Sequence, residues 1–335
     1  MIDNGRISAK NYAAQAEAGI MKWAAAPANY KYRDYDVFFC EMFARAIKNA
    51  VHFAIPDNGD IFDDDLRGLV GLQARLPYPV ITVEYFVDDS KSVRHEAAPI
   101  YAPRRLVLAI ETDKKEIVEY QRKLRISDNV DLFGSFPDDR FAQIMVANEI
   151  NNDWVPLPMS WVLPATWDCW SGDSKVRTVH PLVPAKSKQH ISGAAIPILP
   201  GIFNMLCESR GVDQTFREAI HDIGGEVHAI LELCEALACS NVFTETVQHE
   251  NTKANAKRVR NGKLPIYETK TLSIEVPKST QRAGIKLGNR ASPRQHLRRG
   301  HIRRLPDDRR IWVNSCAVGS PELGKIEKRY RVFSA

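Results

Sequence analysis

Residues 80–86 read Val80-Ile81-Thr82-Val83-Glu84-Tyr85-Phe86, and residues 105–111 read Arg105-Leu106-Val107-Leu108-Ala109-Ile110-Glu111. Both stretches are rich in β-branched, aromatic and other apolar residues, which is typical of strands. Residues 141–147 and 155–163 have a similar makeup. We therefore expect four strands of a mixed sheet between residues 80 and 163.

Helical patterns lie on both sides of these strands. Residues 8–26 are rich in alanine and contain no proline, and Ser8 is a possible N-cap. A second helix is predicted from Asp36 to Pro56, because its apolar residues recur every three or four positions. Residues 191–240 are predicted to be helical again, with a break at Gly224-Gly225. The apolar face of the second helix consists of Phe39, Met42, Phe43, Ala46, Ile47 and Ala50.

The last third of the chain is predicted to be rich in strands. Strands are expected at residues 242–247, 268–276 and 327–333, with a basic linker at residues 251–263. The fold class is therefore α+β. We divide it into an N-terminal helical region (1–76), a mixed sheet with Trp-rich loops (77–190), a second helical region (191–241) and a basic β-rich C-terminal region (242–335).

The charge is distributed unevenly. The net charge is only +5, but residues 251–335 contain 21 Lys and Arg against 6 Asp and Glu, whereas the preceding residues contain 25 and 35. An acidic body with a basic tail has two interpretations: the tail binds a polyanion, or it docks on the acidic body.

The most basic stretch is predicted to be a strand, a tight turn and a strand. Its first strand begins at His296, its turn is Pro306-Asp307-Asp308, and its second strand runs from Arg309 to Cys316. Arginines bind phosphate or carboxylate with two parallel hydrogen bonds, so this hairpin and the preceding linker are candidate RNA contacts. The candidates are Lys253, Lys257, Arg258, Arg260, Arg298, Arg299, Arg303, Arg304, Arg309 and Arg310, with Tyr267 and Trp312 as stacking partners.

The two histidines of the hairpin allow a catalytic hypothesis. A metal-independent ribonuclease needs one imidazole as base, a second as acid, and a cation to stabilise the phosphorane. His296 and His301 have the right chemistry, but residues five apart on a regular strand point to opposite faces. The hypothesis therefore requires a bulge, for which Gly300 is suited. The alternative is that the histidines hydrogen-bond neighbouring strands while the arginines pair with carboxylates.

Tryptophans are concentrated between residues 154 and 170. Trp154, Trp161, Trp167 and Trp170 lie within this short stretch. Such a group lines a pocket for a peptide or a base, or it covers a sheet.

Standard sites for cofactors and metals are missing from the sequence. There is no Gly-rich phosphate loop and no H-E-x-x-H, C-x-x-C or G-x-S-x-G motif. We therefore expect no cofactor and no metal. The six cysteines are scattered, and neither a signal peptide nor a transmembrane segment is recognisable, so we expect a cytoplasmic protein that does not enter a membrane.

Four segments together resemble a family of phage and prophage proteins, mostly called hypothetical, that includes a type V anti-CRISPR protein. The resemblance covers residues 238–318 and is weaker around residues 76–84. The four segments are Ala238-Cys239-Ser240-Asn241-Val242, Asn261-Gly262-Lys263-Leu264-Pro265-Ile266-Tyr267-Glu268, Ser292-Pro293-Arg294-Gln295-His296-Leu297-Arg298-Arg299-Gly300-His301, and Arg310-Ile311-Trp312-Val313.

The resemblance implies a phage-encoded anti-defence protein that binds and does not catalyse. It implies that the protein recognises a host or CRISPR effector polypeptide, as a nascent chain, and engages RNA or the ribosome so that the target's expression falls. The family supplies no catalytic residue that can be carried over. A ribonuclease and a purely structural interaction protein are the alternatives.

Overall fold

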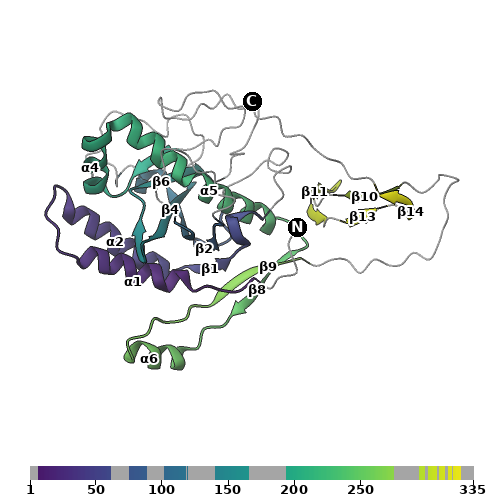
Figure 1. Ribbon diagram of the computed structural model, residues 1–335, viewed down its shortest axis with the longest axis horizontal. Coiled ribbons are helices and arrows are strands. Elements are labelled where there is room, and N and C mark those ends of the chain that lie inside the picture. The colour runs from purple at the N-terminus through teal and green to yellow at the C-terminus, as the bar shows by residue number, and fades with distance from the viewer. Residues whose placement is uncertain are drawn as a thin grey trace.

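The structure is a computed structural model that describes residues 7–61, 75–88, 102–117, 119, 140–165, 194–274, 294–298, 301–307, 309–313, 316–318 and 320–325. It combines helices with a mixed sheet, which confirms the predicted α+β class. Figure 1 shows the sheet between helices, with an arm formed by residues 242–274 and a group of short strands extending from it.

The described part of the chain contains a nine-stranded sheet in the order β7-β6-β4-β3-β2-β1-β9-β8, with β5 paired to β4. β1 runs parallel to β2 and β9, and the other pairs are antiparallel. The strands are β1 (Val51–Ala54), β2 (Val80–Phe86), β3 (Arg104–Asp113), β4 (Arg140–Ile150), β5 (Asp153–Pro156), β6 (Met159–Pro164), β7 (Ala194–Pro197), β8 (Val242–Gln248) and β9 (Thr269–Ile274).

The strands predicted at residues 80–86, 105–111 and 141–147 are confirmed, and the one predicted at 155–163 is divided into β5 and β6. β1 was missed, because residues 51–54 were predicted to continue the second helix to Pro56. That helix ends at Asn49 instead. Phe53 and Ala54 are buried where β1 lies between β2 and β9, so pairing in the middle of the sheet determines their conformation.

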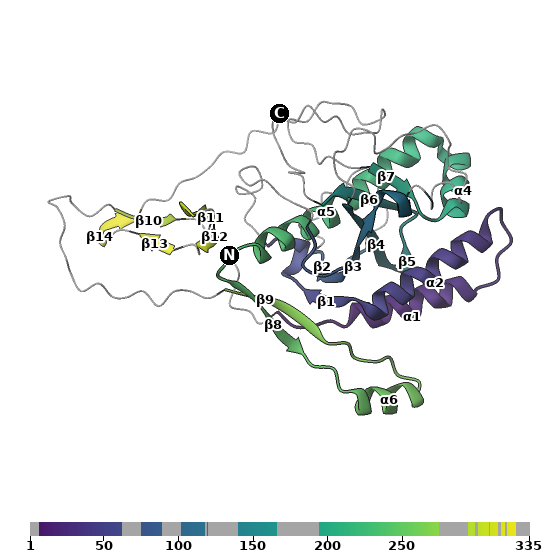
Figure 2. The ribbon, with the colours of Figure 1, turned by 180° about the vertical axis from the view of Figure 1, so that it is seen from behind.

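Helices cover both faces of the sheet (Figures 1 and 2). α1 (Tyr12–Ala25) and α2 (Arg33–Asn49) pack on one face, where Leu106 and Leu108 of β3 are buried. α5 (Val212–Leu237) packs on the other face, against Val107 and Ala109. Neighbouring residues of β3 therefore belong alternately to the two cores, as expected for a strand that is buried on both faces.

Buried carboxylates hold the N-termini of two helices. Glu84 of β2 accepts hydrogen bonds from the backbone N–H groups of Lys10, Asn11 and Tyr12 at 2.6, 3.2 and 2.6 Å. Asp36 of α2 accepts hydrogen bonds at the start of α4 (Pro200–Arg210), from the backbone N–H groups of Gly201 at 2.9 Å and Ile202 at 3.0 Å. Burial raises the pKa of both carboxyls, and these donors partly offset the rise.

Ser8 is not the cap of α1, because that helix begins at Tyr12, so the predicted cap is wrong. The predicted helix break at Gly224-Gly225 is also wrong, because α5 continues through both glycines. Each glycine costs a helix about 1 kcal/mol relative to alanine. The buried Ile223, Val227 and Ile230 offset that cost by packing against the sheet.

The predicted basic linker at 251–263 contains a helix, α6 (Thr252–Arg260), so that prediction is corrected. Asn251 caps it by accepting the backbone N–H of Ala254 at 2.9 Å. Three cations in the last turn, Lys257, Arg258 and Arg260, lie at the negative end of the helix dipole.

The predicted hairpin is confirmed. β11 (His301–Arg304) pairs with β12 (Arg310–Val313) in antiparallel register across the turn at Pro306. β10 (Arg294–Arg298) pairs with β13 (Cys316–Val318) and with β14 (Ser320–Lys325). The strand predicted at 327–333 lies outside the described residues.

Alanine substitution should have opposite effects at two helical glycines. A Cβ at Gly19 would lie 2.7 Å from Cβ of Trp154, whereas a Cβ at Gly225 meets nothing within 4 Å. We expect Gly19→Ala to lower the free energy of unfolding by about 1–3 kcal/mol through overpacking. Gly225→Ala should raise it by up to about 1 kcal/mol. Urea unfolding measures both, and shifts of the same sign would contradict the packing described.

Candidate functional site

The clearest cationic surface is α6, at the end of an arm formed by β8, α6 and β9. Both views show α6 apart from the sheet and its covering helices (Figures 1 and 2). Lys253, Lys257 and Arg260 are exposed. In the described part of the chain, no carboxylate pairs with any of these three. Arg258 is half-buried and donates from Nε to the carbonyl of Leu264 at 2.8 Å.

The return segment of the arm is anchored to the body at Tyr267. Its ring stacks on His52 with centroids 4.8 Å apart, and its hydroxyl donates to Glu17. Asn11 adds a hydrogen bond from Nδ2 to the carbonyl of Pro265 at 3.0 Å. Tyr267 is buried, so one of the predicted stacking partners for a base instead fixes the arm.

The β11–β12 hairpin docks at the C-terminal end of α5. Nη1 of Arg310 lies 2.6 and 2.7 Å from the two carboxylate oxygens of Glu235, which is 1% exposed. Asn241 exchanges two hydrogen bonds with the backbone of Trp312, at 2.7 and 2.8 Å. Trp312 is 9% exposed and belongs to the core beneath α5. Arg310 and Trp312 therefore hold the hairpin on the acidic body.

The other hairpin arginines differ in their surroundings. Arg309 is exposed and pairs with Asp307 at 2.6 Å, and Arg303 is exposed. Arg298 and Arg304 lie on β10 and β11, but their side chains lie outside the described part, as does Arg299 altogether.

The register on the two sides of Gly300 bears on the catalytic hypothesis. Arg298 pairs with Cys316 and His301 pairs with Val313, so three steps along one strand match three steps along the other. Gly300, where the hypothesis needs a bulge, and the side chains of His296 and His301 lie outside the described residues. The ribonuclease hypothesis therefore stays a prediction.

The tryptophans divide between core and undescribed chain. Trp154 is buried against Tyr12 of α1, with ring centroids 5.5 Å apart, and Trp161 is buried in the core beneath α5. These two cover the sheet, as one of the two interpretations expected. Trp167 and Trp170 lie outside the described residues.

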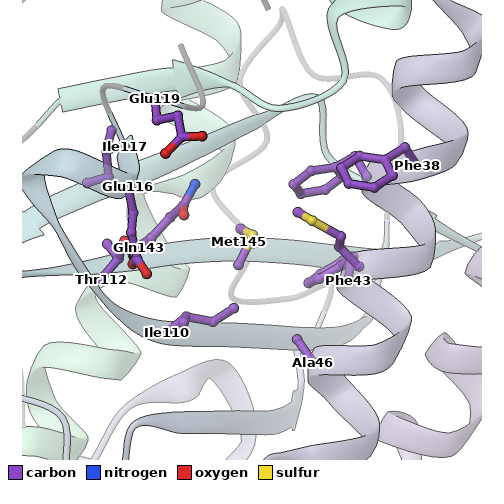
Figure 3. Close-up of a pocket in the computed structure, with 12 residues that line it drawn as sticks. Phe38, Phe43, Ala46, Ile110, Thr112, Glu116, Ile117, Glu119, Gln143 and Met145 are labelled. Atoms are coloured by element: carbon purple, nitrogen blue, oxygen red, sulfur yellow. Dashed lines mark hydrogen bonds between the residues drawn. The ribbon is translucent and has the colours of Figure 1, made fainter. Parts of the chain in front are cut away.

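A pocket that the sequence did not indicate lies between α2 and strands β3 and β4 (Figure 3). Its volume is about 410 Å³. Met42, expected in the buried stripe of α2, is 39% exposed and lines it, and the neighbouring Phe38 is 58% exposed. The lining residues are Phe38, Phe39, Met42, Phe43, Ala46, Ile110, Thr112, Glu116, Ile117, Glu119, Gln143 and Met145.

The pocket is apolar on the α2 side and polar on the other side. Figure 3 shows Phe38 and Phe43 on α2 facing Glu116, Glu119 and Gln143 across the pocket. Among the described residues, the lining set contains two carboxylates and no Lys, Arg or His.

The described residues contain no group of three or more His, Cys, Asp or Glu that could hold a metal ion. Across the same parts of the chain, no helix has the length and apolar character needed to cross a membrane. Comparisons with family models, curated proteins and solved structures found no match to this chain.

Removing Arg310 should test the docking of the hairpin. Arg310→Ala leaves the buried carboxylate of Glu235 without its guanidinium, so we expect a loss of roughly 2–3 kcal/mol in the free energy of unfolding. Arg309→Ala removes an exposed ion pair and should cost less than about 0.5 kcal/mol. Equal effects in urea unfolding would show that Arg310 does not hold the hairpin.

The anchor of the arm should make stability depend on pH. Burial lowers the pKa of His52 from 6.5 to about 4. Below pH 6.5 the unfolded chain binds a proton that the folded chain rejects, so stability falls as pH drops from 6.5 toward 4.

His52→Phe keeps a ring against Tyr267 but cannot titrate. As the pH falls from 6.5 to 4, the free energy of unfolding should therefore decrease more for the parent than for the variant. Parallel pH curves for the two proteins would contradict the buried, neutral state of His52.

Proposed function

We propose that this chain is a non-enzymatic binding protein that engages RNA or ribosomal RNA through α6 and holds a polypeptide at a separate surface. The observation that supports it most is the exposed set Lys253, Lys257 and Arg260, which have no carboxylate partner in the described chain. Lysine and arginine side chains neutralise the phosphates of a nucleic acid and release the counterions bound to them, which favours binding.

The construction of the arm supports this role for α6. Tyr267 and Asn255 fix its return segment, because Asn255 exchanges two hydrogen bonds with the backbone of Ile266 at 2.8 and 2.9 Å. The cations are therefore carried on a short capped helix that is anchored at its base. Fixed positions reduce the conformational entropy lost when the lysine-bearing segment binds.

The resemblance to the phage family supplies the biological part of the proposal. We propose that the polypeptide is a host or CRISPR effector chain. When this protein binds that chain in the bacterial cytoplasm, expression of the target falls. Arg298, Arg299, Arg303 and Arg304 are proposed as further RNA contacts, to be tested separately from α6.

Replacing three cations of α6 should weaken RNA binding. With labelled poly(U) at low salt, Lys253→Gln/Lys257→Gln/Arg260→Gln should lower the affinity by about 10-fold or more and flatten its salt dependence. Glutamine is a good helix former, so α6 should persist. Fluorescence anisotropy over a salt series measures both quantities, and gel analysis of the RNA should show it uncut.

The matched control is Lys22→Gln/Arg45→Gln/Lys48→Gln, which removes the same charge from exposed positions of α1 and α2. We expect its affinity to stay within about twofold of the parent. If both triple variants lose affinity equally, binding follows net charge and α6 is not the site. If the parent does not bind RNA, the proposal fails.

A further inference from the structure

We propose that α6 binds the phosphate backbone of double-stranded RNA and does not read its base sequence. This inference rests on the proposed function, in which α6 engages RNA, and it names the form of RNA that the helix binds. It depends on the arrangement of the cations around α6, on the contacts that hold the helix, and on the aromatic residues of the arm.

The three exposed cations of α6 form a row along one side of the helix. Lys253, Lys257 and Arg260 are separated by four and three residues, so they lie within about 60° of one another around the helix axis. From the first to the last, the row extends about 10 Å along the axis. We call these three residues the cationic row.

The opposite side of α6 contacts the return segment of the arm. Asn255 is buried and exchanges hydrogen bonds with the backbone of Ile266. Arg258 donates to the carbonyl of Leu264. By the same helical geometry, these two residues lie about half a turn away from the cationic row. The row is therefore directed away from the arm.

Both ends of α6 are closed, although the helix has only nine residues. An isolated helix of this length is marginally stable in water, so these end contacts matter. Asn251 caps the start by accepting the backbone N–H of Ala254 at 2.9 Å. At the end, the backbone N–H of Lys263 donates to the carbonyl of Arg258 at 2.9 Å, across Gly262 with a φ of 68°, as in a Schellman motif. The cationic row is therefore held in place before any ligand binds.

A row of cations in fixed positions favours an ordered nucleic-acid backbone. In a duplex the phosphates of one strand recur at a constant spacing, whereas a single strand loses conformational entropy when binding orders it. A duplex also has the higher charge density. The slope of log affinity against log salt is about −0.9 per neutralised phosphate for a B-form duplex and about −0.7 for a single strand. Both effects favour a duplex, and proteins recognise double-stranded RNA mainly through its shape and backbone.

The arm offers α6 no aromatic platform for unpaired bases. Proteins that bind single strands commonly stack the bases on aromatic side chains. Of Phe, Tyr and Trp, residues 242–274 contain only Phe243 and Tyr267. Tyr267 is buried against His52, and Phe243 pairs with Ser273 at the base of the arm, whereas α6 lies at its far end (Figures 1 and 2). Phosphate contacts carry no sequence information, so α6 should not distinguish one base sequence from another.

The test compares double-stranded with single-stranded RNA on the full-length protein. Annealed poly(A)·poly(U) and poly(U) alone are titrated at equal phosphate concentration and followed by fluorescence anisotropy. The parent should bind the duplex at least about fivefold more tightly than the single strand. Poly(G)·poly(C) should bind within about twofold of poly(A)·poly(U).

A charge-transposed variant tests the arrangement of the cations at constant net charge. Lys253→Gln/Lys257→Gln/Ala254→Lys/Val259→Lys moves two cations from the row to exposed positions on the flanks of α6. Glutamine and lysine are good helix formers, so α6 should persist. We expect duplex affinity to fall at least about fivefold, while affinity for poly(U) stays within about twofold because a flexible strand follows the moved charges.

A second measurement does not depend on the transposed variant. Lys253→Gln/Lys257→Gln/Arg260→Gln removes the whole row, so the slope of log affinity against log salt for the duplex should flatten by about 2 to 3. A slope that stays the same as in the parent would overturn the inference even if the transposed variant proves unstable.

The outcomes separate this inference from the proposed function. If the parent binds poly(U) as tightly as the duplex, and removing the row weakens both, the inference is wrong and the proposed function stands. A transposed variant that keeps the duplex preference would show that the row does not cause it. Affinities for the two duplexes that differ by more than about 10-fold would show that bases are read. If the parent binds none of these RNAs, the inference and the RNA part of the proposed function fail together.

Discussion

Three buried glutamates of α5 determine how remote parts of the chain come together. Glu226, Glu232 and Glu235 are almost fully inaccessible, and each is satisfied by a different segment. Arg105 of β3 lies 3.2 Å from Glu226, the backbone N–H of Ile61 lies 2.8 Å from Glu232, and Arg310 lies 2.6 Å from Glu235. A buried carboxylate without a partner costs several kcal/mol, so the partner segments must dock for α5 to be buried. The helix therefore links the sheet, the loop after β1 and the C-terminal hairpin.

This constraint separates two basic segments that look alike in the sequence. Part of the positive charge of the hairpin is paired within the protein, because Arg310 contacts the carboxylate of Glu235. Trp312 of the same hairpin belongs to the core beneath α5. The charge on α6 is external, because its lysines and Arg260 have no carboxylate partner among the described residues. The hairpin therefore agrees with the interpretation in which the basic tail docks on the acidic body, and α6 is the segment for which we propose polyanion binding.

The sequence predicted the fold where local pattern and tertiary environment agree. β2 and β3 were identified because β-branched residues fill strands that are buried on both faces. β1 and the continuity of α5 were missed because long-range packing overrides the local signals at Val51–Ala54 and Gly224-Gly225. The caps from Glu84 and Asp36 could not be found locally, because each joins residues more than 70 positions apart.

The candidate surfaces were predictable to different degrees. The basic residues of α6 were visible as a charge cluster, but their helix and its position on an arm depend on pairing between β8 and β9. The pocket had no signal in the sequence, because α2, β3 and β4 contribute residues separated by long stretches of chain. Met42 and Phe38 read as ordinary members of an amphipathic helix, and only their exposure distinguishes them.

We propose that α6 binds a polyanion, whereas the hairpin contacts the protein's own body. Hydrogen–deuterium exchange with and without poly(U) distinguishes the two segments. We predict that RNA slows exchange in residues 252–260 and leaves β12 unchanged, because the N–H of Trp312 is already bonded within the protein. Protection of β11 and β12 with no change in α6 would contradict the account.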